Sequence, residues 1–296
     1  MFKALVGSVA VVMPGAAPAS GGNDGMSSVK PTRHRAFYAF IVAALLSFSL
    51  PAAAQTVLIT GANTGIGLAF AKEYATRSWT VIATHHQPVT PPELATLAAR
   101  YPKVRVEKMD VSSKEEIDAV AAKLKGVPID VVINNAGVYA KSGAPASQDF
   151  GQFDYALFDT IMAVNVRGPL MVMEAFIGNV KASHQKKFVA ISSTVGSLTA
   201  PYPGGGAIFY RASKAALNKE MQVLADVLKP DGVSVVMIHP GLVRTERLKS
   251  LAPGLVANKD YVDPPEAVSQ MVPTIEKLTI ADTGHFLRYD GVPLPW

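Results

Sequence analysis

The sequence predicts one doubly wound α/β domain with a parallel sheet over residues 55–296. Three observations support this fold class. Short apolar or β-branched runs alternate with segments of helical periodicity along the whole range. The strand segments are almost continuously apolar, as expected for strands covered by helices on both faces. A glycine-rich turn at residues 60–67 joins the first strand to the first helix.

The elements follow one another in regular alternation. Strands are predicted at 56–60, 79–84, 104–110, 129–133, 188–192, 233–238 and 285–289. Helices are predicted at 66–77, 91–101, 112–124, 155–176, 210–228 and 264–278. Ile66, Phe70 and Tyr74 share one face of the first helix, and Ser112 with Glu115 forms a predicted capping box for the third. Such alternation implies right-handed crossovers, and no internal repeat divides the range.

Residues 1–54 depart from this pattern and predict a leader. From Met26, a basic segment precedes an apolar run over 36–50, and small residues at 51–54 precede Gln55. This order is typical of a secretory signal peptide over 26–54, and predicts a periplasmic or exported protein. The run of about 15 residues is shorter than a membrane span of roughly 20, so no stable span is expected after processing. An uncleaved anchor and a start-site artefact are the alternatives to this signal peptide, and Met26 is a candidate for the true start. A cytoplasmic location is the alternative to export because of the cofactor inferred below.

Composition narrows the class of protein. The chain has 296 residues, of which 49% are hydrophobic and 17% charged, enough for a substantial core. It has no cysteine, which removes disulfides and the common structural zinc sites, and no metal site is predicted. The net charge is +5, but four basic residues and one acid in the leader leave only +2 for the rest. No dense basic patch follows, so a nucleic-acid partner is not expected.

The segment from Thr60 to Gly67 predicts a dinucleotide site on a Rossmann-type sheet. Gly61, Gly65 and Gly67 allow a tight turn, close approach of the backbone and close helix packing, so that backbone N–H groups and the helix dipole face a pyrophosphate. A glycine cluster alone is weak evidence; its position between a strand and a helix makes it specific.

The end of the second predicted strand indicates which dinucleotide binds. Sites for NAD usually place an acid there, on the ribose 2′-hydroxyl. No acid lies between Glu73 and Glu93, and the position contains His85 and His86, which could donate hydrogen bonds to a 2′-phosphate. NADP(H) is therefore favoured over NAD(H), with plain exposed turn residues as the alternative for these histidines.

Six motifs in order resemble the short-chain dehydrogenase/reductase family over nearly all of 56–296. They are the glycine turn, Asp110-Val111, Asn-Asn-Ala-Gly at 134–137, Asn165, the Ser193 segment with Tyr210-x-x-x-Lys214, and the segment 240–245. Residues 210–218 and the ending 284–296 are most similar to the sniffer-like carbonyl reductases and C-factor-like proteins. The resemblance implies cofactor contacts from Gly61, Asn63, Thr64, Gly65, Ile66, Gly67, His86, Asp110, Val111, Asn135, Ala136, Gly137, Tyr210, Lys214, Pro240, Gly241, Val243 and Thr245.

Tyr210 and Lys214 are the predicted centre of the chemistry. Reduction of a carbonyl needs a hydride, which a nicotinamide supplies, and a proton from a reloadable acid. A free tyrosine has a pKa near ~10, and the i, i+4 spacing places the Lys214 ammonium on the same helical face, where it lowers that pKa. The resemblance further implies that Lys214 holds the cofactor ribose, and that Asn165 holds a water behind Lys214.

Ser193 is predicted to hydrogen-bond the substrate oxygen. It directly follows the strand at 188–192, but it precedes Tyr210 by 17 positions where the family usually has about 13. Ser197, at the usual spacing, is the rival. With Ser193 chosen, the extra residues form a glycine-rich loop over the site.

The predicted pocket is bounded by residues 139–153, the loop through Phe209, and residues 246–261. Its apolar side chains favour a small apolar or aromatic carbonyl substrate: Tyr139, Phe150, Phe153, Tyr202, Phe209 and Leu248. The main hypothesis is an NADPH-dependent carbonyl reductase. An NAD-dependent alcohol dehydrogenase and a C-factor-like, cofactor-binding signalling protein are the alternatives. A homo-oligomer is expected, because the resemblance implies packing through the helices that carry Asn165 and Tyr210.

Overall fold

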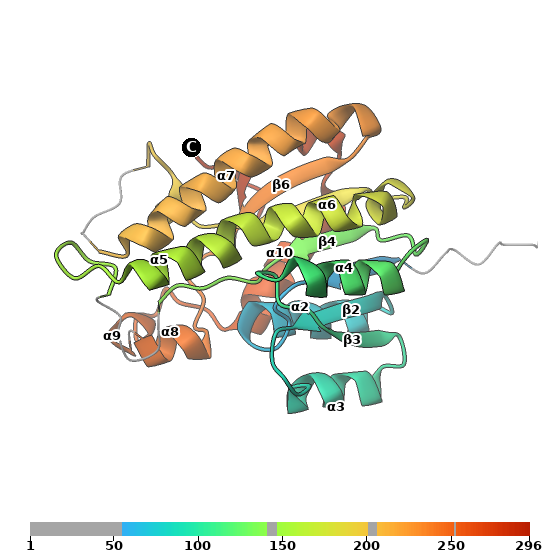
Figure 1. Ribbon diagram of the computed structural model, residues 1–296, viewed down its shortest axis with the longest axis horizontal. Coiled ribbons are helices and arrows are strands. Elements are labelled where there is room, and N and C mark those ends of the chain that lie inside the picture. Colours follow the sequence, from blue (N-terminus) through green and yellow to red (C-terminus); the bar gives the residue numbers. More distant parts are fainter. Residues whose placement is uncertain (1–54, 141–146, 201–205, 252) are drawn as a thin grey trace, which may run out of the picture. The chain divides into compact units, whose positions relative to one another are not determined.

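The structure is a computed structural model that describes residues 55–140, 147–200, 206–251 and 253–296 (Figure 1). The predicted leader, Tyr202 and most of the predicted glycine-rich loop before Tyr210 lie outside the described residues.

Seven parallel strands form one sheet in the order β3-β2-β1-β4-β5-β6-β7, which confirms the predicted fold class. Val57 of the central β1 pairs with Val81 of β2 on one side and with Val131 of β4 on the other. The order reverses between β1 and β4, and ligands of such sheets bind at the carboxyl ends of the strands beside this point. The strands are β1 (Thr56–Ile59), β2 (Thr80–His85), β3 (Val104–Lys108), β4 (Val131–Asn134), β5 (Lys187–Ile191), β6 (Ser234–His239) and β7 (Phe286–Arg288).

Two layers of helices cover the sheet (Figure 1). Alternate strand residues face alternate layers: Val57 and Ile59 pack in the core under α2, α3 and α10, and Leu58 packs under α4, α6 and α7. The helices are α2 (Gly65–Thr76), α3 (Pro92–Arg100), α4 (Lys114–Lys123), α5 (Tyr155–Met162), α6 (Gly168–Lys181), α7 (Ile208–Leu228), α8 (Glu246–Leu251), α9 (Pro253–Val256) and α10 (Pro264–Lys277). Short α8 and α9 were not predicted.

Two further details differ from the sequence prediction. The N-cap of α4 is Ser113, whose hydroxyl accepts from Glu116 N at 3.3 Å, so the predicted Ser112–Glu115 box is wrong by one residue. Ser112 instead bonds Asp110 Oδ1 through both its N and its Oγ. The predicted helix at 155–176 continues to Lys181 but contains a π turn, η1 (Ala163–Arg167), centred on Asn165. Single π turns in helices frequently mark functional sites.

The combined helix Tyr155–Lys181 is long and apolar enough, by length and composition alone, to cross a membrane. Its apolar character has a simpler cause, because Val172, Met173, Phe176 and Val180 pack in the core beneath α6. We therefore interpret it as a core helix.

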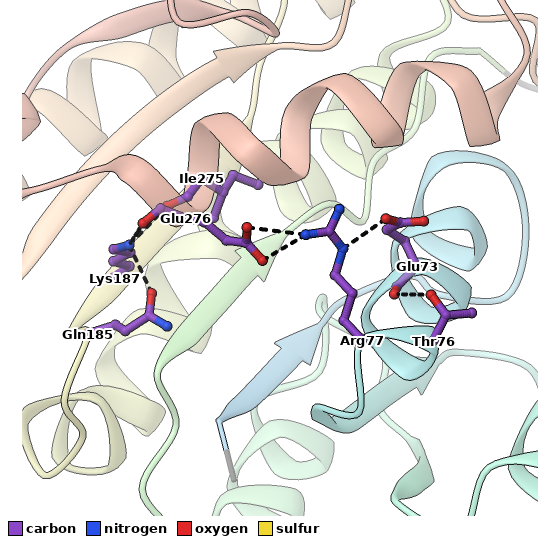
Figure 2. A network of polar contacts seen from close by, with 7 residues as sticks. All are labelled: Glu73, Thr76, Arg77, Gln185, Lys187, Ile275 and Glu276. Atoms are coloured by element: carbon purple, nitrogen blue, oxygen red, sulfur yellow. Dashed lines mark hydrogen bonds and ion pairs between the residues drawn. The ribbon is translucent and has the colours of Figure 1, made fainter. Parts of the chain in front are cut away.

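A polar network closes the amino edge of the sheet, opposite the predicted site (Figure 2). Lys187, at the start of β5, donates to the carbonyl oxygens of Ile275 and Glu276, each at 2.9 Å, at the end of α10. Arg77 bridges Glu73 at 2.8 Å and Glu276 at 3.1 Å, and so joins α2 to α10. A cation at a helix C-terminus satisfies its last carbonyls and its dipole, which suits a structural role.

Candidate active site

The glycine turn is joined to the end of β4 through Thr60. The Thr60 hydroxyl accepts hydrogen bonds from Asn135 N and Ala136 N, both at 3.0 Å. Asn135 returns the contact, since its Nδ2 donates to Thr60 O at 2.9 Å and to Gly61 O at 3.2 Å. The two motifs predicted to bind cofactor therefore form one rigid unit at the switch point of the sheet.

The glycines of this turn are required by close packing. Gly61 has φ +65°, and a Cβ there would lie 2.9 Å from Ala136 Cα. A Cβ on Gly67 would lie 2.3 Å from Gly61 O, and one on Gly65 would lie 3.3 Å from Thr245 Cγ2. Thr245 follows β6, so the segment 240–245 reaches the glycine turn.

The first turn of α2 suits an anion. Its N-cap, Thr64, makes no side-chain capping hydrogen bond, and the first turn has no acidic residue. In the described part of the chain, neither the N-cap nor the first turn of α2 supplies an anionic or capping side chain to these N–H groups and to the positive end of the helix dipole. Asn63 and Ile66 lie in the same turn.

The ends of β2 and β3 form the other half of the predicted cofactor site. His85 is buried, with 3% of its surface exposed, and burial is the main cause that lowers its pKa. Its predicted contact with a 2′-phosphate is therefore unsupported, whereas His86 is exposed. Asp110 and Val111 follow β3, and the Asp110 carboxylate is held by Ser112 at 2.7 and 2.8 Å.

Asn165 connects the end of β4 to α7. It is 1% exposed, and its Oδ1 accepts from Val138 N at 2.8 Å while its Nδ2 donates to Val138 O at 2.8 Å. Nδ2 also donates to Ser213 Oγ at 3.0 Å, and that hydroxyl donates to Tyr210 O at 2.7 Å. Both amide N–H groups are thus used within the protein, so the side chain positions the tyrosine helix. The water expected at Asn165 could therefore bind this side chain only by donating a hydrogen bond to its Oδ1.

Tyr210 and Lys214 lie in the first two turns of α7. The Lys214 Nζ is 5.7 Å from the centroid of the Tyr210 ring and donates to Ile191 O at 2.8 Å. Lys214 is 5% exposed, and this burial lowers the pKa of its ammonium to about 8. The Tyr139 ring packs edge-on to Tyr210, with centroids 4.9 Å apart.

The turn after β5 contains Ser193 and its rival. Ser193 caps the short turn Thr194–Gly196, and a Cβ on Gly196 would lie 2.6 Å from Lys214 C. The turn that begins with Ser193 therefore packs directly on the tyrosine helix. The Ser197 hydroxyl accepts from Ala200 N at 2.9 Å, at the far side of the turn, which favours Ser193.

The segment after β6 completes the edge. Gly241 has φ +82°, and a Cβ there would lie 3.1 Å from the Tyr289 ring. Val243 is buried and pairs in a parallel bridge with Val262. Pro240 follows His239, whose pKa burial lowers to about 4, so that this imidazole is neutral.

The predicted pocket lining needs correction. Phe209 is 5% exposed and packs against Phe153 and Phe158, with ring centroids 5.1 and 5.2 Å away. Phe153 and Phe209 therefore anchor the start of α7 to α5. Phe150 is 89% exposed, and Leu248 is partly exposed on α8.

Sequence reasoning missed four supporting residues. Thr60 begins the glycine turn and Ser213 lies between Tyr210 and Lys214, so both stand within predicted motifs, which was the available signal. Gly196 lies three residues after Ser193, and no role was predicted for it. Gln148 had no signal at all; it is completely buried and donates to Tyr139 O at 2.7 Å.

The chain belongs to the short-chain dehydrogenase family, whose model matches residues 55–255. Within it, the chain is similar to carbonyl reductases of the sniffer-like subgroup and to C-signal. An NADPH-bound carbonyl reductase from chicken fatty liver has 30% identity and a TM-score of 0.73, covering 82% of this chain and 99% of that one. Carbonyl reductase Sniffer of D. melanogaster has 27% identity and a TM-score of 0.72, over 82% and 100%. C-signal of Myxococcus xanthus is 35% identical over 170 residues, 57% of this chain and 93% of that protein.

These similarities confirm the predicted family, subgroup and enzyme class. The chain is an NAD(P)-dependent oxidoreductase of the short-chain dehydrogenase/reductase type.

Proposed function

We propose that the protein reduces small apolar or aromatic aldehydes and ketones to alcohols with NADPH. One observation carries the proposal: a buried ammonium, Lys214, lies 5.7 Å from the ring centroid of Tyr210 at the carboxyl edge of the sheet. Burying an ammonium beside a phenol costs free energy that a purely structural lysine would not need. The arrangement suits a phenol, Tyr210, that must lose and regain a proton.

The residues present fit the cofactor. A Cβ on Gly61 would collide with Ala136 and one on Gly67 with Gly61 O, so the glycine turn packs backbone to backbone on the end of β4. The N-terminus of α2 has no side-chain cap between its N–H groups and a pyrophosphate. Asp110 and Val111 would hold the adenine, and Pro240, Gly241, Val243 and Thr245 the nicotinamide end. When bound, the reduced nicotinamide supplies the hydride.

The chain's own residues supply and direct the proton. The Tyr210 hydroxyl donates its proton to the substrate oxygen as the carbonyl becomes an alkoxide. The Lys214 ammonium stabilises the resulting phenolate electrostatically. Ser193, on the turn packed against Lys214, donates a hydrogen bond to the same substrate oxygen and holds it near the phenol. Asn165 keeps α7 in register with the end of β4.

The preference for NADPH rests on the end of β2. No acid stands there to repel a 2′-phosphate, and the exposed imidazole of His86 can donate to it. Introducing a carboxylate with His86→Asp is expected to raise the KM for NADPH at least about tenfold, with little change for NADH. An unchanged ratio of the two KM values would contradict this assignment.

The substrate class rests on Tyr139, beside Tyr210, and on apolar side chains of the segments expected to border the pocket. Tyr139 packs against it, and the exposed Phe150 and the partly exposed Leu248 lie on two of the segments expected to border the pocket. NADPH consumption should be measured with aromatic aldehydes and diketones, and Tyr210→Phe should remove the activity. Oxidation of alcohols with NAD and no reduction would favour the alternative dehydrogenase. Tight cofactor binding without turnover would favour a signalling role.

We further propose a homo-oligomer that packs through the helices carrying Asn165 and Tyr210. A groove of about 650 Å³ runs between them, lined among others by Val164, Leu170 and Glu220. Light scattering on the purified protein tests this, and a monomer would overturn it.

Export is a separate proposal, supported by the order of charged, apolar and small residues over 26–54. N-terminal sequencing of the protein from fractionated cells is the test. A mature start at Gln55 in the periplasm is expected, and a full leader on cytosolic protein would refute it.

A further inference from the structure

The N-terminus of α7 is capped from elsewhere in the chain. Its own N-cap residue, Ala207, has a left-handed backbone with φ 52° and no side-chain acceptor. The unpaired N–H groups of the first turn are taken up by Gln148 and Asp149. Asp149 Oδ1 accepts from Ala207 N at 3.0 Å, Gln148 O accepts from Ile208 N at 3.3 Å, and Gln148 Oε1 accepts from Tyr210 N at 3.0 Å.

The Gln148 side chain is used at both ends. It is 0% exposed, and its Nε2 donates to Tyr139 O at 2.7 Å while its Oε1 accepts from Tyr210 N. One buried amide therefore fixes the main chain of both tyrosines whose rings touch at 4.9 Å. The side chain at position 148 must accept from the Tyr210 N–H and donate to the Tyr139 carbonyl, with both groups at its end. Apart from a protonated glutamic acid, only glutamine offers both among the neutral side chains of this length.

We propose that Gln148 is a positioning residue for Tyr210, holding the phenol against Tyr139 through a neutral cap on the third residue of α7. The inference rests on the proposed function, in which Tyr210 is the proton donor. It assigns no direct contact with substrate to Gln148, which acts through Tyr210 and Tyr139.

The neutrality of this cap matters for the charge around Tyr210. The phenol is in the first turn of α7, where the helix dipole presents partial positive charge, and the Lys214 ammonium follows one turn later. A carboxylate at position 148 would oppose both and disfavour the phenolate. Titratable groups on the elements packed against this end of α7 are Tyr139, Asp149, Asp154, Tyr155, Asp159 and Arg167, with Arg211 and Lys214 on α7 itself.

Gln148→Glu separates electrostatics from geometry. When protonated, a glutamic acid keeps both hydrogen bonds, so the variant can fold at mildly acidic pH. Even a strongly buried glutamate ionises by about pH 9, and the titration extends above that pH, so that the phenol is compared with the carboxylate present. Because the two acids interact, ionisation of one raises the pKa of the other. The near-ultraviolet absorbance titration of Tyr210, taken as the difference between each protein and the same protein with Tyr210→Phe, should then move to higher pH by about one unit or more.

Gln148→Leu removes both hydrogen bonds without adding charge. We expect kcat with the best aldehyde of the panel to fall at least about tenfold, because the phenol is misplaced, while the KM for NADPH stays within about twofold. Asn179→Leu is the matched control. Asn179 is also a buried amide, donating to Leu124 O at 2.7 Å and Val127 O at 2.8 Å, but it lies near the far end of α6. It should lose stability without changing kcat or the titration.

An unmoved titration of Tyr210 in Gln148→Glu would overturn the inference, as would wild-type kcat in Gln148→Leu. If Gln148→Leu does not fold, Gln148→Glu decides alone. The proposed function fails separately: equal activity of wild type and Tyr210→Phe refutes it, and the absorbance titration, which needs no turnover, still tests Gln148.

Discussion

Replacing Lys214 with methionine should stabilise the fold while removing its activity. The structure lowers the pKa of the Lys214 ammonium from 10.5 to about 8 by burial alone. At 1.36 kcal/mol per unit, this corresponds to about 3 kcal/mol spent at pH 7 on keeping the charge inside. Lys214→Met removes that cost but leaves Ile191 O without its 2.8 Å donor, a loss of about 1–2 kcal/mol. The expected net gain is about 1–2 kcal/mol.

The stability difference between Lys214→Met and wild type should depend on pH. The folded state binds this proton less tightly than the unfolded state, so the cost is complete below about pH 8 and disappears as the pH rises to 10.5. Urea unfolding at pH 7 and pH 10 should therefore show the variant's advantage only at pH 7. Lys187→Met is the control: this buried lysine has three oxygen acceptors, so its loss should destabilise. A Lys214→Met protein less stable than wild type at pH 7, or a gain independent of pH, would refute the reasoning.

Three further predictions concern the supports of the site. Burial raises the pKa of Glu220 to about 7, so the stability of the wild type should fall as the pH rises from about 4.5 to 7. In thermal unfolding, Glu220→Gln should gain about 1 kcal/mol at pH 8, after discounting the partial exposure of this side chain, and nothing at pH 4. Thr60→Val leaves two N–H groups unpaired and should cost about 2–3 kcal/mol and weaken NADPH binding in calorimetry, while Thr60→Ser should behave as wild type; equal loss in both would count against the hydroxyl. Gly196→Ala forces a Cβ to 2.6 Å from Lys214 C and should cost at least about 2 kcal/mol of stability, with loss of kcat. The control Gly178→Ala, with no heavy atom within 4 Å of its new Cβ, should be neutral or stabilising. An active Gly196→Ala protein would show that the turn after Ser193 does not pack on α7 as described.

The sheet was predictable because its strands are buried on both faces. Val57, Leu58 and Ile59 are all fully buried, so the apolar run needs no alternation to be recognised. Helix boundaries were harder to predict where neighbouring side chains compete for the same hydrogen bonds. Ser112 resembled an N-cap, but Asp110 occupies its hydroxyl and its N–H, and the cap passes to Ser113. The π turn at Asn165 continues the apolar pattern of its flanking helices and leaves no periodic signal.

In the site, too, residues joined by local spacing were predictable and residues joined by long-range contacts were not. Gly61, Gly67 and the Tyr210–Lys214 pair have fixed spacing within one turn or helix, so the sequence carries their geometry. Gln148 lies 62 positions before Tyr210 and contacts it only because the chain folds back. Phe209 was expected to line the pocket, but the sequence did not indicate that it faces α5, where Phe158 packs against it.

The rate of NADPH consumption with an aromatic aldehyde, in wild type and in Tyr210→Phe, tests the central claim most directly. The structure places the centroid of the Tyr210 ring 5.7 Å from a buried ammonium, so wild type should turn over the aldehyde. The variant should be slower by at least about a hundredfold while binding NADPH equally well. Equal rates in the two proteins would show that Tyr210 is not the proton donor.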